Sequence, residues 1–181
     1  DVYLRGYSGS ANQYLTVHGN GATASTSTAG WLGTDITLTN VTANTINLGT
    51  FYAHTLNATS GAITGAGTVT ATTANLVSTN GNITVGNYSV TDLTAQASNG
   101  SIVDGGGTIT ASHGVLLEAV NYDIGSSGSS VKVNAPYLWI KSDAAGRSVY
   151  VNESMSPTYM NITTNNGLVA ISGTPTLGYS P

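Results

Sequence analysis

Apolar and polar residues alternate along most of the chain in short stretches with a period of two, and glycine or asparagine interrupts the alternation every few residues. Such alternation is typical of half-buried β-strands, because successive side chains on a strand point to opposite faces. The 3.6-residue period of a helix is nearly absent. The sequence therefore predicts an all-β protein with strands of roughly three to five residues. The expected strands include Ile36–Leu38, Thr45–Leu48, Val69–Ala71, Ile83–Val85, Ile109–Ala111, Val131–Val133, Leu138–Ile140 and Val149–Val151.

A longer period is superimposed on this alternation. The phrases Gly61-Ala-Ile63, Gly81-Asn-Ile83 and Gly100-Ser-Ile102 follow one another at intervals of about 20 residues. Several short strands in each repeat of this length are what a β-solenoid requires, because each coil stacks its strands on those of the previous coil. The prediction is a right-handed parallel β-helix of roughly eight coils with about 20 residues per coil. A β-sandwich is the alternative, but a sandwich does not require this register.

Stacked coils should place equivalent apolar side chains in continuous interior columns, since one coil cannot bury its own apolar residues. Two columns are predicted, the first formed by Ile63, Ile83, Ile102 and Ile124 and the second by Val69, Val90, Ile109 and Val131. We expect a single solenoid domain over residues 1–181. Within it, residues 1–35 are expected to form an irregular N-terminal or capping region, 36–151 regular coils, and 152–181 a C-terminal coil or excursion.

The composition narrows the possible functions. Only 7% of the residues are charged, Lys and Arg together number 4, and the formal net charge is -4. Such a chain offers no basic stripe for a nucleic acid and no polybasic patch for an anionic membrane surface. No apolar run is long enough to span a membrane, so membrane insertion is not expected. Cysteine is absent, which excludes disulfides. The chain opens without a signal-peptide pattern, and we expect it to represent a mature or excised segment.

Several phrases resemble the repeats of a known adhesin family. These are Leu76-Val-Ser-Thr-Asn-Gly-Asn-Ile83, Ala97-Ser-Asn-Gly-Ser-Ile102, the segment from Tyr122 to Val133, and Ser148-Val-Tyr-Val-Asn-Glu153. They are similar to repeats of filamentous-haemagglutinin-type adhesins, which are two-partner-secreted bacterial surface proteins. The resemblance covers roughly residues 36–153 and includes no Asn-Pro-Asn-Gly type signature of that family's secretion domain. It implies a right-handed β-helix shaft, an extracellular location at the bacterial cell surface or in the medium, and a role in adhesion or biofilm cohesion.

Polysaccharide lyases and hydrolases also use β-helices, so a catalytic cluster is one possibility for this chain. Asp104, Asp123 and Asp143 lie about one coil apart and, with Lys141, are the candidate acidic cluster. The phrases Ser112-His113-Gly114 and Ile140-Lys141-Ser142 distantly resemble elements of polygalacturonases, but the paired aspartates expected before the histidine are absent. Asp104 and Asp123 are more simply interpreted as turn residues that bind backbone amides. We therefore assign no catalytic residue.

Metal and cofactor sites are not predicted either. His18, His54 and His113 have no close metal-ligand spacing. Asp104-Gly-Gly-Gly107 is the only phrase similar to a calcium-binding β-roll repeat. Regular threonines beside Val69, Val90 and Ile109 would form a ladder of the kind that binds ice, which is a minor alternative.

Aromatic residues gather toward the two ends of the chain, where they could stack on sugar rings or simply cover the solenoid. They are Tyr3, Tyr7, Tyr14, Trp31, Tyr137, Trp139, Tyr150 and Tyr159. The sequence predicts a non-catalytic extracellular adhesin or surface module whose partner is another copy of the chain or a cell-surface glycan or protein. A self-assembling fibre subunit that stacks end to end is the alternative, and a polysaccharide lyase or hydrolase is a lesser one.

Overall fold

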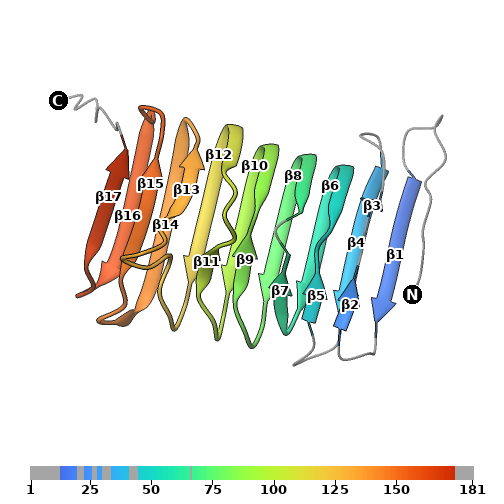
Figure 1. Ribbon diagram of the computed structural model, residues 1–181, viewed down its shortest axis with the longest axis horizontal. Coiled ribbons are helices and arrows are strands. Elements are labelled where there is room, and N and C mark those ends of the chain that lie inside the picture. The colour runs from blue at the N-terminus through green and yellow to red at the C-terminus, as the bar shows by residue number, and fades with distance from the viewer. Residues whose placement is uncertain are drawn as a thin grey trace.

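The computed structural model is an all-β solenoid, as the sequence predicts (Figure 1). It describes residues 13–19, 23–25, 28–29, 34–40, 45–65 and 67–173. Parallel strands stack in about 6 turns with ~20 residues per turn. This is fewer than the roughly eight coils expected, because that number extended the repeat over the whole chain, including parts of residues 1–44 and 174–181 that lie outside the described residues. No helix long and apolar enough to cross a membrane occurs in the described ranges.

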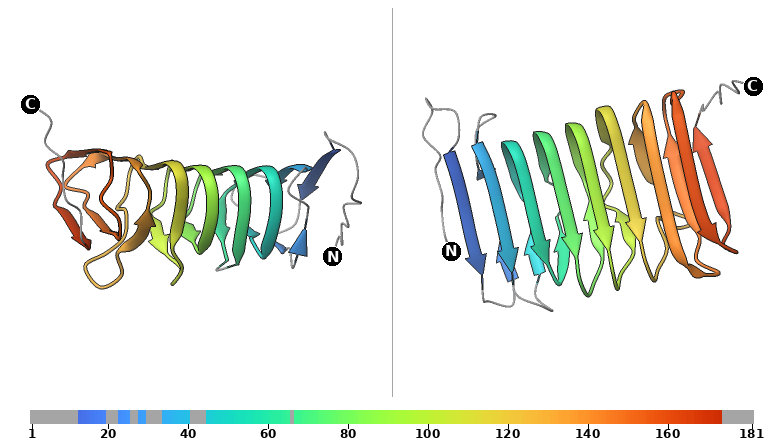
Figure 2. Two further views of the ribbon diagram at one scale, coloured as in Figure 1. Left: turned by 90° about the horizontal axis from the view of Figure 1, so that it is seen from above. Right: turned by 180° about the vertical axis from the view of Figure 1, so that it is seen from behind.

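The strands lie in two sheets that wrap around one interior (Figure 2). The short strands β2, β5, β7, β9 and β11 form one sheet, and the other strands, which include all the long ones, form the second. In chain order the strands are β1 (Gln13–Gly19), β2 (Thr23–Ser25), β3 (Thr28–Ala29), β4 (Thr34–Asn40), β5 (Thr45–Asn47), β6 (Thr50–Ser60), β7 (Ala62–Thr64), β8 (Thr68–Ser78), β9 (Ile83–Val85), β10 (Asn87–Ala97), β11 (Ile102–Asp104), β12 (Ile109–Ala119), β13 (Val131–Asn134), β14 (Tyr137–Ala145), β15 (Val149–Glu153), β16 (Tyr159–Asn165) and β17 (Val169–Gly173).

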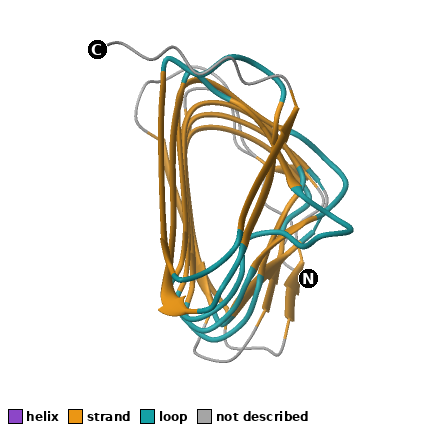
Figure 3. Ribbon diagram, turned by 90° about the vertical axis from the view of Figure 1, so that its left-hand side faces the viewer, coloured by secondary structure: helices purple, strands orange, loops and turns teal. Residues whose placement is uncertain are grey.

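The long strands β6, β8, β10 and β12 each have 11 residues, so the expected length of three to five residues is wrong for them. Each contains a bend at which two successive side chains point away from the core, for example Thr72 and Thr73 in β8. The bend resets the inside-outside alternation, and for this reason one strand looks like two short ones in the sequence. The bend also divides each long strand into a leading half, which precedes it, and a trailing half, which follows it. This division gives the coil the three-sided outline seen along its axis (Figure 3).

The first predicted interior column is confirmed. Ile63 pairs with Ile83, Ile83 with Ile102, and Ile102 with Ile124, and all four side chains are buried. The same column also includes Ile46, which pairs with Ile63, and Val149, which pairs with Ile124. Equivalent branched side chains from successive coils therefore fill one edge of the core at the strand spacing of about 4.8 Å.

The second predicted column needs a correction. Val69 pairs with Tyr88, and Tyr88 pairs with Ile109, which in turn pairs with Val133. Val90 instead lies beside Ala71 and Ala111, and Val131 lies beside Val151. The predicted register was displaced by two residues at β10 and β13. A displacement of two keeps every side chain on its own face of the strand, so the alternation of the sequence alone could not detect it.

Strand stacking extends beyond the predicted regular region. At the N-terminal side β1 pairs in parallel with β4, so part of the expected capping region joins the long sheet. After Val151 the chain makes a turn and then adds β16 beside β14 and β17 beside β15. Residues 152–173 therefore form a further coil, whereas residues 174–181 lie outside the described residues.

One buried polar group stands out in the interior. Glu153 pairs with Val133 and is fully buried at 0% exposure. Its Oε1 atom accepts a hydrogen bond from the backbone N–H of Met155 at 3.1 Å, while Oε2 has no hydrogen-bond partner among the described residues. The buried hydroxyl of Ser142, by contrast, donates to the carbonyl oxygen of Tyr122 at 3.1 Å. Burial raises the pKa of Glu153, although amide donors around the carboxylate oppose the shift.

We expect Glu153→Gln to raise the melting temperature at neutral pH by about 2–4 °C, because it removes a buried charge while the Gln carbonyl can still accept the Met155 bond. A raised folded-state pKa means that the folded chain holds the proton more tightly than the unfolded chain. Stability is therefore lost as the pH rises from the ordinary carboxyl pKa through the raised one. Thermal unfolding between about pH 4 and pH 8 should show the gain at the upper end and little difference at the lower end. An equal gain at every pH would contradict this explanation, and Glu153→Met provides an apolar variant of similar length.

Candidate functional site

The most distinctive surface lies on the outward side of the trailing halves in the C-terminal coils. In the earlier coils this side carries small polar residues, such as Asn57 and Asn75, whose side-chain amides hydrogen-bond to each other at 2.8 Å. Toward the C-terminus larger side chains take the same position on successive strands. Asn75 pairs with Thr94, Thr94 with Leu116, and Leu116 with Trp139. Within this column the aromatic residue is confined to β14, because Trp139 pairs in turn with Asn161 on β16.

Four rings form a continuous series that we call the aromatic row: His113 on β12, Tyr137 and Trp139 on β14, and Tyr159 on β16. The ring centroids of His113 and Tyr137 are 5.2 Å apart, those of Tyr137 and Trp139 6.1 Å, and those of Trp139 and Tyr159 5.7 Å. Tyr137 and Trp139 lie within 14° of parallel. Trp139 is 37% exposed and Tyr159 45% exposed, so the row presents apolar surface to solvent.

A β-bulge positions the first ring of the row. Val90 pairs with Ala111 and Asp92 with Gly114, so β12 contains one more residue than β10 between the paired positions. The extra residue brings the Nδ1 atom of His113 to 2.6 Å from Oδ1 of Asp92. The next residue, Gly114, has no side chain, and this leaves room for two neighbouring groups. A Cβ at this position would lie 3.2 Å from Cζ3 of Trp139 and 3.2 Å from Oδ1 of Asp92. The indole of Trp139 can therefore extend over β12.

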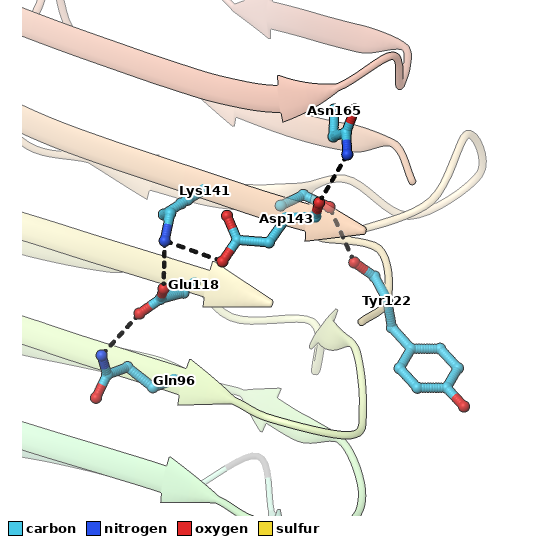
Figure 4. Close-up of polar contacts among 7 residues, drawn as sticks. Gln96, Glu118, Tyr122, Lys141, Asp143 and Asn165 are labelled. Atoms are coloured by element: carbon cyan, nitrogen blue, oxygen red, sulfur yellow. Dashed lines mark hydrogen bonds and ion pairs between the residues drawn. The ribbon is translucent and has the colours of Figure 1, made fainter. Parts of the chain in front are cut away.

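A second series of side chains, the polar ladder of Gln96, Glu118, Lys141 and Asp143, is drawn in Figure 4. Lys141 follows Trp139 by two residues on β14, so the ladder lies farther along the same strands than the aromatic row. The side-chain amide of Gln96 donates to Glu118 at 2.8 Å, and the Lys141 ammonium lies 3.0 Å from Glu118 and 2.9 Å from Asp143. The carboxylates of Asp143 and Glu118 raise the pKa of Lys141. Both carboxylates are thereby fixed across two coils at the edge of the row.

The structure does not assemble the acidic cluster considered from the sequence. Asp104 binds Lys132 at 2.8 Å and Ser129 at 3.1 Å, whereas Asp123 accepts the backbone N–H of Ser148 at 2.7 Å. Of the four candidate residues, only Asp143 and Lys141 contact each other within the described ranges. The interpretation of Asp104 as a turn residue is confirmed, because it accepts the N–H of Gly106 at 3.0 Å. Burial opposes ionisation of Asp104, but the hydrogen bonds from Lys132, Gly106 and Ser129 prevail and lower its pKa.

The polygalacturonase-like phrases are also separated. Gly114 and Glu118 are the positions on β12 that pair with Tyr137 and Lys141, so His113 and Lys141 differ by more than four residues along the strand direction. At about 3.3 Å per residue this separation exceeds roughly 13 Å. His113 and Lys141 therefore belong to different parts of the surface, the first to the aromatic row and the second to the polar ladder.

The two histidines whose side chains are described, His54 and His113, lie apart with different partners. His54 lies 3.1 Å from Asp35, and hydrogen bonds from His54 and Thr55 lower the pKa of that carboxyl group. His113 lies beside Asp92, and the side chain of His18 is outside the described residues. Among the described residues, no group of three or more potential ligands could hold a metal ion.

Sequence reasoning identified Tyr137, Trp139 and Tyr159 as candidate stacking residues but missed the contribution of Asp92, His113 and Gly114. The spacing of Tyr137 and Trp139 did contain a signal, since residues two apart on a strand lie on the same face. The bulge that adds His113 to the row has no comparable signal in the sequence. Tyr3, Tyr7 and Trp31 lie outside the described residues, and the side chain of Tyr14 is not described.

No family model matches the chain, and no curated protein or solved structure matches it. The class of protein is therefore defined by the fold: a parallel β-solenoid with repeated coils that carries an aromatic row and a polar ladder on one outer side.

Proposed function

We propose that this chain is a non-catalytic extracellular adhesin or surface structural module that mediates cell adhesion or biofilm cohesion. The observation that carries the proposal is the aromatic row, because exposed aromatic patches on a soluble fold mark interaction surfaces. The repeat phrases that resemble filamentous-haemagglutinin-type adhesins point in the same direction. They also support a location at the bacterial cell surface or in the medium.

The architecture suits a contact surface that must bear load. Each long strand is hydrogen-bonded to a strand on either side, so side chains on successive coils are held at a fixed spacing of about 4.8 Å. Binding residues on such a scaffold lose little freedom when a partner arrives. The buried columns of isoleucine and leucine extend under the aromatic row through Leu138 and Ile140.

The charges on the surface favour a glycan or protein partner over a nucleic acid. The described lysines are each paired with a carboxylate, Lys132 with Asp104 and Lys141 with Glu118 and Asp143. The guanidinium of Arg147 lies 5.2 Å from the ring centroid of Tyr122. None of these cations belongs to a continuous basic stripe in the described part of the chain. This part of the surface therefore does not complement the phosphate backbone of a nucleic acid.

Adhesion can be measured directly. Beads coated with the chain should retain bacterial or host cells under flow better than beads coated with an unrelated β-solenoid of similar size. Retention that does not exceed this control on any cell type would contradict the proposal. The same assay with soluble chain added as competitor separates specific contact from passive adsorption.

A fibre subunit remains the alternative function. β16 pairs with β14 and β17 with β15, and these two strands form the last described layer, whose far edge pairs with no other described strand. Stacking of a second copy on such an edge would produce a filament one solenoid wide. Negative-stain electron microscopy with light scattering distinguishes the two functions: long thin fibres support the subunit, and discrete short rods support the adhesin. The dispersed positions of Asp104, Asp123 and Asp143 give no support to a lyase or hydrolase.

A further inference from the structure

We propose that the aromatic row binds neutral glycans, with sugar rings stacking on Tyr137, Trp139 and Tyr159. This inference rests on the proposed function, for which it supplies the chemical class of the ligand. It follows from three properties of the surface: the exposed rings, the fixed polar groups beside them, and the sign of the surrounding charge.

The rings offer both parts of a sugar-binding surface. Carbohydrate rings have apolar C–H faces and polar edges, and exposed Tyr and Trp provide a flat apolar body with a polar tip. Trp139 and Tyr159 retain much of their surface in solvent, and their centroids are 5.7 Å apart. The hydroxyl of Tyr159 accepts a hydrogen bond from the side-chain amide of Asn161 at 3.2 Å. This arrangement leaves the phenol O–H free to donate to a sugar oxygen.

Neighbouring groups hold the rings in place before a ligand binds. Asp92 fixes His113 at 2.6 Å, and His113 in turn contacts the ring of Tyr137. Gly114 provides the space for the indole of Trp139, as the 3.2 Å approach to a Cβ at that position shows. A surface that is already ordered loses less conformational entropy on binding, which favours affinity.

The charge near the row favours neutral ligands over anionic ones. Asp92 contacts His113 within the row, while Glu118 and Asp143 lie farther along β12 and β14, where they share Lys141, the one ammonium group of the polar ladder. Sulfated or uronic acid glycans would meet net negative charge, and like charges brought together on binding cost free energy. Neutral sugars avoid this repulsion and can use the carboxylate oxygens as hydrogen-bond acceptors.

The dimensions suit an oligosaccharide. The row extends from β12 through β14 to β16, which are consecutive strands of the sheet. Two steps of about 4.8 Å give a length of roughly 10 Å along the solenoid axis. An extended glycan lying along the axis can therefore contact several rings at once.

The test is affinity electrophoresis of the whole chain in gels containing laminarin, galactomannan or hydroxyethylcellulose as neutral probes, and heparin or polygalacturonate as anionic probes. We expect retardation by at least one neutral probe, and Trp139→Ala should weaken it at least tenfold, as expected for removal of a central aromatic anchor. Because no ion pair forms with a neutral glycan, about 0.5 M NaCl should leave the retardation unchanged.

Tyr52→Ala is the matched control, since Tyr52 is 42% exposed but lies on the leading half of β6, away from the row. It should bind like the wild type. Gly114→Val is a second variant that removes no ring, and it should weaken binding by displacing Trp139. Circular dichroism and thermal unfolding establish that each variant is folded.

Retardation by anionic probes only, an equal loss in Tyr52→Ala and Trp139→Ala, or no retardation by any neutral probe would each overturn the inference. If the beads retain cells while the neutral glycans fail, the adhesin proposal stands and its partner is a protein or another ligand. If neither assay is positive, both proposals are wrong.

Discussion

Ile102→Ala should lower the free energy of unfolding by about 2–5 kcal/mol, the usual cost of truncating a fully buried aliphatic side chain. Ile102 lies in the middle of the first interior column, between Ile83 and Ile124, and its side chain is 0% exposed. The cavity would open between two coils that are held by parallel strands on both sides, so it cannot close by a local shift of one loop. Urea or thermal unfolding followed by circular dichroism measures the loss.

Val103→Ala is the control for this variant. Val103 is the next residue on β11 but points away from the core and is only partly buried. Its truncation should cost less than about 1 kcal/mol. If the two variants are destabilised equally, the column does not carry the stability that we assign to it. Since each coil contacts only its neighbours, hydrogen exchange should show the loss of protection for Ile102→Ala concentrated in β9 and β11.

Gly107→Ala should also be strongly destabilising, at about 3 kcal/mol, although it adds only one methyl group. Gly49, Gly67, Gly86 and Gly107 occupy equivalent positions before the long strands and form a glycine column. A Cβ on Gly107 would overlap the carbonyl carbon of Gly86 and the amide nitrogen of Asn87. These are backbone atoms next to the bond from the N–H of Tyr88 to the carbonyl oxygen of Thr108 at 3.0 Å, so relief requires the coils to separate.

Gly128→Ala is the matched glycine control. A Cβ at Gly128 would have nothing within 4 Å, and the residue lies in an exposed turn. Its substitution should change the free energy of unfolding by less than about 0.5 kcal/mol. Chemical denaturation of the two alanine variants in parallel checks the prediction. Equal effects would mean that backbone proximity at Gly107 does not limit stability.

The fold could be predicted to a large extent from the sequence because a solenoid depends on local repetition. The phrases ending in Ile63, Ile83 and Ile102 repeat at the length of one coil, and each such residue contacts its equivalent in the next coil. A repeat of this kind encodes its own neighbour contacts, so no long-range pairing has to be guessed. Conversely, the lengths of the strands were wrong because the bends in β6, β8, β10 and β12 interrupt the alternation without ending the hydrogen bonding.

The candidate site could be predicted only in part. Tyr137 and Trp139 are two residues apart and share a face by the geometry of any strand. Tyr159 joins them because β16 pairs with β14 in a particular register, and His113 joins because of the bulge opposite Asp92. For the acidic residues the sequence suggested a cluster that the structure does not form. Asp104, Asp123 and Asp143 share the spacing of the repeat, but each binds a different partner.

The sequence by itself determined the all-β class, the coil length and the interior isoleucine column, because these depend on the alternation of side chains and on a repeat that is visible in the chain. Only the tertiary structure decided the register of Tyr88 and Val90, the corner at which each long strand bends, and the row formed by His113, Tyr137, Trp139 and Tyr159. The physical reason is that register shifts of two residues and single-residue bulges preserve which side chains face the core. They change only which side chains become neighbours across coils, and that choice is made by packing between strands.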